Sequence, residues 1–187
     1  MSRVALKSLD TAVRRAETDS DIRWDIFKIQ PGWVGVMAST EGICRLTLPQ
    51  PGQAEALGQL KPPPGATRTD NLVSSLATKL ESYFKGISTD FPFSLDLGGY
   101  TPFESLVFQA CAQIPYGQTA SYGQIARQIG YPKAARAVGQ ALHKNPVPLI
   151  VPCHRIIAGS GKTGGFNGGI NIKCWLLTLE ARKPSDL

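Results

Sequence analysis

The sequence contains few histidines and cysteines, and it contains no long apolar run. There are two histidines, His143 and His154, and four cysteines without paired spacing. Zinc sites and disulfide frameworks need clusters of these residues, so the sequence predicts no metal site and no disulfide scaffold. No apolar stretch approaches the length of a membrane span, and Met1–Ala5 does not begin a secretion signal. We expect a cytoplasmic protein without a membrane partner and without a cofactor.

Acidic residues are scarce in the second half of the chain. Residues 1–96 contain 11 lysines and arginines against 11 acidic residues, whereas residues 97–187 contain nine against three. The whole net charge of +6 therefore lies in the second half, which favours an anionic partner such as nucleic acid. Together with a change in sequence character near residues 87–100, this asymmetry predicts two domains, residues 1–96 and residues 97–187.

The first half has the pattern of a small sheet and a helix. Apolar and β-branched runs predict strands over residues 24–29, 33–37 and 43–48, joined by turn residues into an antiparallel meander. A helical repeat over 72–84, with Asp70 or Asn71 as its cap and Gly86 as its stop, predicts a helix packed on this sheet. Nothing in this half has catalytic character, which indicates a structural role.

The second half has a helical pattern. Residues 103–114 predict a helix whose inner face carries Leu106, Val107, Ala110 and Ile114. Ser121-Tyr122-Gly123-Gln124 has the form of a capping box and predicts a second helix that ends at Gly130. Pro132 then begins a third helix, so this region resembles a helix-turn-helix.

The helix predicted after Pro132 carries small residues and a basic stripe. Its apolar face contains Ala135, Val138 and Leu142, and its opposite stripe includes Lys133 and Arg136. Gly139 inside a helix costs about 1 kcal/mol relative to alanine, so another backbone or surface is expected to approach it closely. That surface is either an external groove or the protein's own interior. Arg136 is either a solvated charge or a side chain that reaches into a bound partner.

Cys153 and His154 form the best candidate for reactive chemistry. Residues 148–151 are apolar and bounded by prolines, which predicts a short buried strand that ends beside Cys153. A thiol becomes a useful nucleophile when a base lies near it, and His154 is the candidate base, directly or through a water. The alternative is a buried structural cysteine followed by a turn. The other cysteines, Cys44, Cys111 and Cys174, lie among apolar residues or on an amphipathic helix and are interpreted as packing residues.

Gly161-Lys162-Thr163 looks like the end of a phosphate-binding loop. Ile156 occupies the position where the earlier glycine of that motif is required, and no strand-loop-helix order follows. We therefore exclude nucleotide binding at this loop.

Four motifs occur in one register: Arg136-Ala137-Val138-Gly139, Asn145-Pro146-Val147-Pro148, Val151-Pro152-Cys153-His154-Arg155 and Leu176-Leu177-Thr178-Leu179-Glu180. Their order and spacing resemble those of the alkylguanine-DNA alkyltransferases, also called methylated-DNA-protein-cysteine methyltransferases. The resemblance covers about residues 100–182. It implies an α/β (α+β) fold with an N-terminal ribonuclease-H-like domain and a mainly helical C-terminal domain that contains a winged helix-turn-helix-like motif.

The resemblance also implies residue roles. Cys153 would take an alkyl group irreversibly from 6-O-alkylguanine in double-stranded DNA, so that each molecule acts once. His154 would deprotonate the thiol through a water, Glu180 would orient His154, and Asn145 would tie the recognition helix to the thiol. Glu180 closes a helix that begins near Asn171, whose inner face is predicted to contain Ile172, Trp175, Leu176 and Leu179.

By the same resemblance the protein enters the minor groove as a monomer and flips the damaged nucleotide. The implied DNA-binding residues are Tyr122, Arg136, Ala135, Gly139 and Lys133. The implied base pocket contains Tyr122, Pro148, Val151 and Phe166. Family members often carry tyrosine and a small polar residue where this chain has Phe166-Asn167.

Three other functions remain open from the residues. A non-catalytic relative would bind lesions without repairing them, although such proteins replace the cysteine. A cysteine hydrolase that uses Cys153, His154 and Glu180 would turn over repeatedly. A transcriptional regulator with a helix-turn-helix would prefer one DNA sequence.

Overall fold

The computed structural model describes residues 21–87, 90–159, 161 and 163–181. The expectations for Met1–Ala5 and for Lys162 lie outside these residues. Within the chain, contacts define two compact units, Met1–Ser74 with Phe93–Asp96, and Ser75–Pro92 with Leu97–Leu187. The predicted boundary after residue 96 places Ser75–Pro92 in the first domain, whereas the contacts assign this segment to the second unit. Whether either half is an independent domain stays a prediction.

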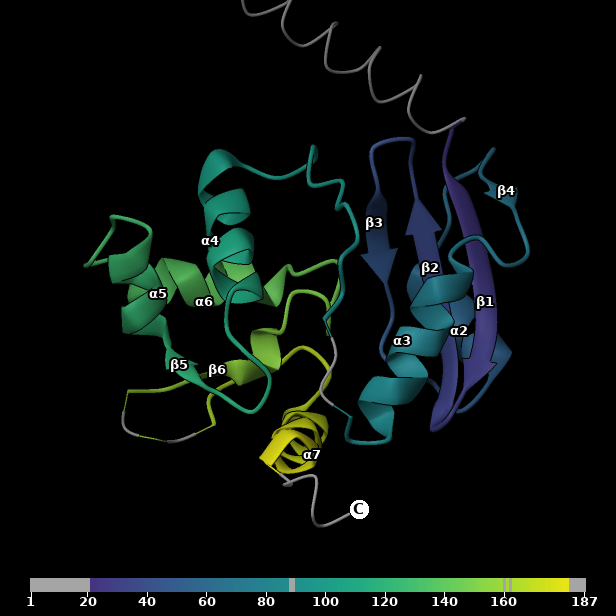
Figure 1. Cartoon of the computed structure of the whole chain (residues 1–187). Coiled ribbons are helices and arrows are strands. Elements are labelled where there is room, and N and C mark those ends of the chain that lie inside the picture. Colours follow the sequence, from purple (N-terminus) through teal and green to yellow (C-terminus); the bar gives the residue numbers. More distant parts are fainter. Residues whose placement is uncertain (1–20, 88–89, 160, 162, 182–187) are drawn as a thin grey trace, which may run out of the picture. The chain divides into compact units, whose positions relative to one another are not determined.

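The first unit contains a four-stranded sheet in the order β3-β2-β1-β4 (Figure 1). Strands β1 (Arg23–Ile29), β2 (Gly32–Ala38) and β3 (Ile43–Leu46) form the predicted antiparallel meander, with β3 two residues shorter than expected. Strand β4 (Thr67–Arg68) pairs parallel to β1 and was not predicted, because two residues carry no periodic signal. The fold is therefore mixed α/β, and the ribonuclease-H-like description stays a prediction.

Helix α2 (Gln53–Leu60) packs on this sheet. Ala56 and Leu60 are fully buried and join a core cluster with Ile22, Ile26 and Met37. Gly35 of β2 lacks a side chain where a Cβ atom would lie 3.1 Å from Leu60, so the helix can approach the sheet closely. That residues 72–84 pack on this sheet stays a prediction. Helix α2 was missed because eight residues that include Gly58 give too weak a periodic signal.

Helix α3 (Ser74–Phe84) begins two residues later than predicted. Asn71 has a φ of 57°, so the chain turns there before the helix starts. The predicted stop is confirmed, because Gly86 has a φ of 78° and its N–H group donates to the carbonyl oxygen of Tyr83.

The second unit contains α4 (Pro102–Ala112), α5 (Tyr122–Gln128) and α6 (Ala135–His143). The capping box predicted at Ser121 is confirmed: Ser121 accepts from the N–H group of Gln124, whose side chain accepts from that of Ser121. Helices α5 and α6 contact each other across a short turn. Helix α6 begins three residues after Pro132, so Lys133 lies in the turn rather than on the helical stripe. A winged helix-turn-helix stays a prediction.

The segment before Cys153 is a turn rather than the predicted strand. Leu149 has a φ of 73°, and the N–H group of Val151 donates to the carbonyl oxygen of Val147 over 2.9 Å. Pro148 and Pro152 lack N–H groups, so this short run cannot extend a ladder and closes on itself instead. A single 3₁₀ turn, η1 (Cys153–Arg155), follows it.

Behind η1, β6 (Ile156–Ile157) pairs parallel with β5 (Ala120–Ser121). This pairing joins the residues just after the thiol to the residues just before α5. It therefore holds η1 close to the start of the helix-turn-helix-like segment.

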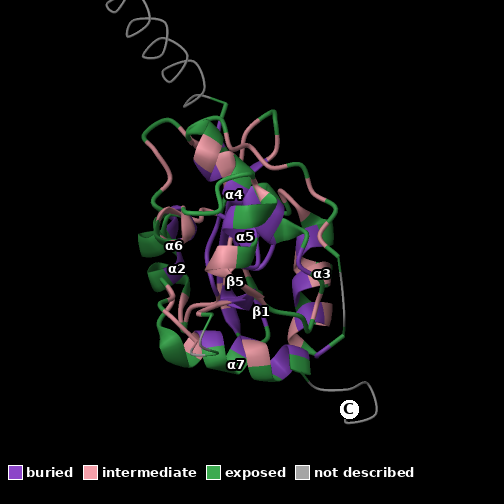
Figure 2. Ribbon diagram, turned by 90° about the vertical axis from the view of Figure 1, so that its left-hand side faces the viewer, coloured by how far each residue is buried: buried purple, intermediate pink, exposed green. Residues whose placement is uncertain are grey.

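Buried and exposed residues alternate along helix α7 (Ile170–Ala181) (Figure 2). Leu176 and Leu179 pack inward as predicted. The inward assignment of Trp175 was wrong: its side chain is 42% exposed and stacks on Phe84. Cys174 is likewise exposed rather than a packing residue. On α4, Leu106 is 40% exposed, because the apolar stripe there is narrower than predicted.

Among the described residues, no helix combines the length and the apolar character that a membrane span requires.

Candidate active site

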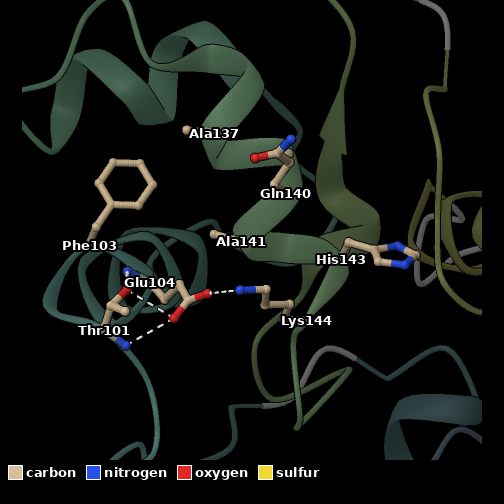
Figure 3. A pocket seen from close by; sticks show the side chains of 9 residues that line it. Thr101, Phe103, Glu104, Ala137, Gln140, Ala141, His143 and Lys144 are labelled. Atoms are coloured by element: carbon tan, nitrogen blue, oxygen red, sulfur yellow. Dashed lines mark hydrogen bonds and ion pairs between the residues drawn. The ribbon is translucent and has the colours of Figure 1, made fainter.

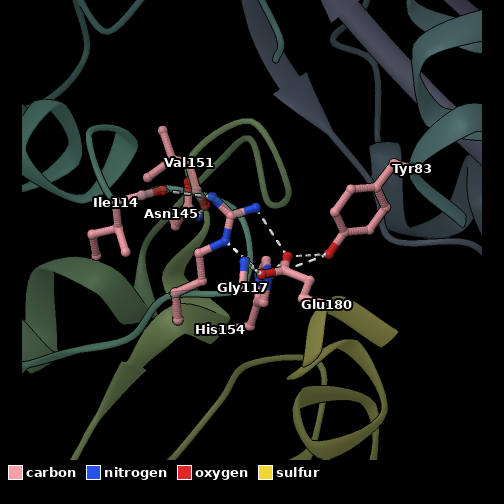
Figure 4. Close-up of polar contacts among 8 residues, drawn as sticks. Tyr83, Ile114, Gly117, Asn145, Val151, His154 and Glu180 are labelled. Atoms are coloured by element: carbon pink, nitrogen blue, oxygen red, sulfur yellow. Dashed lines mark hydrogen bonds and ion pairs between the residues drawn. The ribbon is translucent and has the colours of Figure 1, made fainter. Parts of the chain in front are cut away.

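Glu180 lies at the centre of a buried polar network near the end of α7 (Figure 4). Its Oε1 atom lies 2.6 Å from the Tyr83 hydroxyl, 2.7 Å from Nε2 of His154 and 2.9 Å from Nη2 of Arg155. Its Oε2 atom accepts from Nε of Arg155 at 2.8 Å and from the N–H group of Gly117 at 3.1 Å. Burial raises the pKa of Glu180, but the donors from His154 and Arg155 outweigh burial and lower the pKa to about 2. Glu180 is therefore a carboxylate at neutral pH.

His154 is completely buried beside Glu180. A carboxylate can only accept, so the proton of the neutral imidazole lies on Nε2, and Nδ1 carries the lone pair. Nδ1 is buried and has no hydrogen-bond partner among the described residues. Burial lowers the pKa of His154, and this exceeds the opposing effect of Glu180, so the ring is neutral. The structure therefore provides a neutral base with one nitrogen anchored and the other free.

Cys153 begins η1, and its side chain is half-buried. Nδ2 of Asn145 donates to the sulfur over 3.1 Å and to the carbonyl oxygen of Val151 over 2.7 Å. Burial raises the pKa of the Cys153 thiol, while the Asn145 amide and the charge of Lys173 oppose this shift. The thiol is thus protonated at neutral pH, and ionising it requires a base.

Asn145 links two segments as well as contacting the sulfur. Its Oδ1 atom accepts from the N–H group of Val147, while its amide nitrogen holds the carbonyl oxygen of Val151. The turn that presents Cys153 is therefore fastened to the end of α6. The structure thus joins the four predicted catalytic residues through two sets of contacts, Asn145 with Cys153 and His154 with Glu180.

Two residues of this site, Tyr83 and Lys173, were not predicted from the sequence, and a third, Arg155, was expected to place its positive charge near the thiol. Tyr83 comes from the half of the chain to which we assigned no function, and no local pattern links it to Glu180. The charge of Arg155 is directed at Glu180 and at the carbonyl oxygen of Ile114 rather than at the thiol. Lys173 is fully buried and donates to the carbonyl oxygen of Ile156 over 2.5 Å. Its position three residues before the inward-facing Leu176 was an available signal.

Tyr122 is the first residue of α5, and its side chain lies close to two glycines that are distant in the sequence, Gly139 and Gly164. A Cβ atom on Gly139 would lie 3.5 Å from the Tyr122 ring, and one on Gly164 would lie 3.1 Å from its hydroxyl. A Cβ atom at 3.5 Å makes an ordinary van der Waals contact, so the packing of Tyr122 on α6 does not require glycine at position 139. Both alternatives for Gly139, an external groove and the protein's own interior, therefore stay predictions.

The other predicted DNA-binding and pocket residues differ in their exposure to solvent. Arg136 and Lys133 are exposed, and Ala135 is half-buried. Val151 is buried beneath the turn, while Pro148 and Phe166 are half-buried. These positions agree with surface and pocket-wall locations, and the roles assigned to the residues remain predictions.

A pocket of about 520 Å³ lies beside α6 and the start of α4 (Figure 3). Its lining includes Gly139, Gln140 and an ion pair of 2.6 Å between Lys144 and Glu104. Hydrogen bonds from Lys144 and from Thr101 lower the pKa of Glu104 to about 2. Cys153 does not line this pocket.

Together the fold and the site define a mixed α/β protein in which a half-buried thiol directly precedes a buried imidazole that is hydrogen-bonded to a carboxylate. Comparisons with known proteins specify the family. Residues 102–182 match the family model described as 6-O-methylguanine DNA methyltransferase, DNA binding domain. The methylated-DNA–protein-cysteine methyltransferase of Mycobacterium tuberculosis is 52% identical over 127 residues, which cover 67% of this chain and 73% of the relative. The protein of that name from Mycolicibacterium paratuberculosis is 48% identical over 124 residues, 66% of this chain and 74% of the relative.

A solved structure, Mycobacterium tuberculosis OGT in complex with DNA, is also similar. It has a TM-score of 0.71 and 39% identity, and the match covers 85% of this chain and 92% of that chain. The chain belongs to the methylated-DNA–protein-cysteine methyltransferase family.

Proposed function

We propose that this protein repairs alkylated DNA by moving the alkyl group from 6-O-alkylguanine onto the sulfur of Cys153. The observation that carries the proposal is the combination of a half-buried thiol, held by Asn145, with a buried His154 whose Nε2 is anchored by Glu180. Such a thiol is protonated at rest, and the adjacent residue supplies a base. The DNA complex of the similar M. tuberculosis protein supports DNA as the partner.

The proposed reaction begins with proton transfer from the Cys153 thiol to Nδ1 of His154, directly or through a water. Glu180 stabilises the imidazolium that forms. The thiolate then attacks the alkyl carbon, a carbon–sulfur bond forms, and the bond between that carbon and O6 of guanine breaks. The electron pair of the broken bond passes to the guanine, which is left unalkylated when it gains a proton from the imidazolium or from solvent.

The product on the protein is a thioether. Displacement of the alkyl group from a neutral thioether would have to expel the Cys153 thiolate, which is a poor leaving group, so the alkyl group stays on the protein and each molecule acts once. We also propose that the protein acts as a monomer and without a cofactor. A hydrolase that used the same three residues would instead release its product and turn over.

Access to the lesion requires the damaged nucleotide to leave the base stack. We infer that α6 enters the minor groove with Arg136 at its exposed face, while Tyr122 lines the pocket that receives the base. The excess of basic residues after residue 96 supports binding to the phosphate backbone, which suits repair without sequence preference. Ala135, Gly139 and Lys133 complete the proposed DNA surface, and Pro148, Val151 and Phe166 complete the proposed base pocket.

Intact mass spectrometry tests this function. The protein is mixed with double-stranded oligonucleotide that contains 6-O-methylguanine, and we expect a gain of one methyl group on the peptide that contains Cys153, with one lesion repaired per protein. The variant Cys153→Ser should gain no methyl group. Cys174→Ser is the matched control because Cys174 is exposed, and it should react like the unaltered protein. Repeated repair by one molecule, or unchanged mass with loss of the lesion, would exclude the proposal.

A further inference from the structure

Tyr83 on α3 contributes a buried hydroxyl to the Glu180 network, although it lies outside the matched residues 102–182. Its side chain is fully buried. Its hydroxyl lies 2.6 Å from Oε1 of Glu180 and 3.3 Å from Nε2 of His154 (Figure 4). The hydroxyl therefore contacts both residues that we propose to activate the thiol.

The direction of this hydrogen bond follows from the charges. Glu180 is a carboxylate and can only accept, so Tyr83 donates. Burial raises the pKa of Tyr83, and the charge of Glu180 raises it further, so the phenol keeps its proton at every pH of interest. Tyr83 thus donates to the same oxygen that accepts from His154.

We propose that Tyr83 is a positioning residue for alkyl transfer, because it fixes Oε1 of Glu180 and limits the negative charge that this oxygen presents to His154. The inference rests on the proposed function of Cys153. It assigns a part in the reaction to a segment that precedes the matched DNA-binding domain.

The expected direction depends on all the groups around His154. Glu180 favours the imidazolium, whereas Arg155 and Lys173 disfavour it, and Cys153 is neutral at rest. A donated hydrogen bond from Tyr83 also weakens the pull of Glu180 on a proton. Without the hydroxyl, Glu180 attracts the proton more strongly, so the pKa of His154 rises.

The test compares Tyr83→Phe with Tyr116→Phe. Tyr116 packs edge-to-face against Tyr83 with a ring separation of 5.8 Å, and its buried hydroxyl has no hydrogen-bond partner among the described residues. Both variants remove one buried phenolic oxygen from the same aromatic cluster, but only Tyr83→Phe removes a donor to Glu180.

For Tyr83→Phe we expect methyl transfer to slow about tenfold at neutral pH, because Oε1 of Glu180 loses a donor that fixes it and His154 loses its fixed orientation. This loss, typical of one hydrogen bond to a charged group, outweighs the gain in basicity of His154. The acidic limb of the rate profile should move to higher pH. Histidine NMR should show the matching rise in the pKa of His154, which is one of two histidines and is identified by comparison with His143→Gln. Tyr116→Phe should leave the rate profile and the His154 titration unchanged.

The outcomes separate this inference from the proposed function. If the unaltered protein gains no methyl group, the proposed function fails, and the His154 titration still tests the contact with Tyr83. The inference about Tyr83 is wrong if the unaltered protein reacts and Tyr83→Phe has the same rate of methyl transfer, the same acidic limb of the rate profile and the same titration of His154. A lower melting temperature of Tyr83→Phe, with no change in the acidic limb or in the titration of His154, would also overturn the inference. Such a result would mean that Tyr83 contributes to packing alone.

Discussion

At the residue scale, single polar atoms influence the pKa of the Cys153 thiol. The sulfur lies where burial raises its pKa, and the amide of Asn145 is the nearest donor that opposes this shift. The same amide nitrogen holds the carbonyl oxygen of Val151. Reactivity and local stability therefore depend on one side chain.

Asn145→Ala should weaken both properties. The pKa of the Cys153 thiol should rise further, and methyl transfer should slow. The free energy of unfolding should fall by about 1–3 kcal/mol, because the carbonyl oxygen of Val151 and the N–H group of Val147 lose their partner. Iodoacetamide labelling of the Cys153 peptide against pH measures the first effect, and urea unfolding measures the last.

Asn171→Ala is the control for this prediction. Asn171 is exposed near the start of α7, and its removal should change neither the labelling of Cys153 nor the urea midpoint appreciably. Equal behaviour of the two variants would show that the amide of Asn145 has no influence on the thiol.

At the element scale, the loop between β6 and α7 determines where Tyr122 lies. Gly164 has a φ of 70°, and its backbone lies close to the Tyr122 hydroxyl. A second link is the hydrogen bond of 3.3 Å from the Asn167 side chain to the carbonyl oxygen of His143 on α6. The loop is thus connected to both helices that we propose to meet DNA.

Gly164→Ala should disturb this arrangement. An alanine Cβ atom would lie 3.1 Å from the Tyr122 hydroxyl, and a positive φ costs about 1 kcal/mol for a residue with a side chain. We expect Tyr122 to move and methyl transfer to slow severalfold, measured by single-turnover repair of the oligonucleotide.

Gly165→Ala is the matched control, because a Cβ atom there meets nothing within 4 Å and the residue has no positive φ. It should repair at the rate of the unaltered protein. An undiminished rate for Gly164→Ala would mean that Tyr122 tolerates displacement or that it plays no part in the reaction.

At the scale of the whole molecule, buried titratable groups make stability depend on pH. Burial lowers the pKa of His154 below its usual value of 6.5, so the unfolded chain binds this proton more readily than the folded protein. Glu180 and Glu104 have pKa values of about 2 against a usual value of 4.5, and they act in the same direction. The stability from all three groups is present at neutral pH and is lost on acidification.

We therefore expect the urea midpoint to fall as the pH drops below about 6.5, with a second decline from about 4.5 toward 2. Urea unfolding between pH 7.5 and pH 4 measures the first decline. His143→Gln should show the same profile, because His143 is exposed and is not part of the network. A constant midpoint over this range would contradict the neutral state assigned to His154.

The sequence predicted the elements whose signals are local and long. The three antiparallel strands, helix α4 and the capping box at Ser121 follow from periodicity and turn chemistry. Helix α2 and strand β4 were missed because their segments are too short for a clear period. The strand predicted before Cys153 was wrong, because apolar character alone does not distinguish a strand from a turn between two prolines.

The motifs predicted Cys153, His154, Glu180 and Asn145 as one site, and the structure joins Asn145 to the thiol and His154 to Glu180. The identity of these residues and the basic character of the second half were determined by the sequence alone. Only the tertiary structure decided that Tyr83 completes the carboxylate network, that Arg155 faces Glu180 rather than the thiol, and that Nδ1 of His154 is the free nitrogen. These contacts join segments up to 97 residues apart, and such distances depend on packing rather than on local sequence.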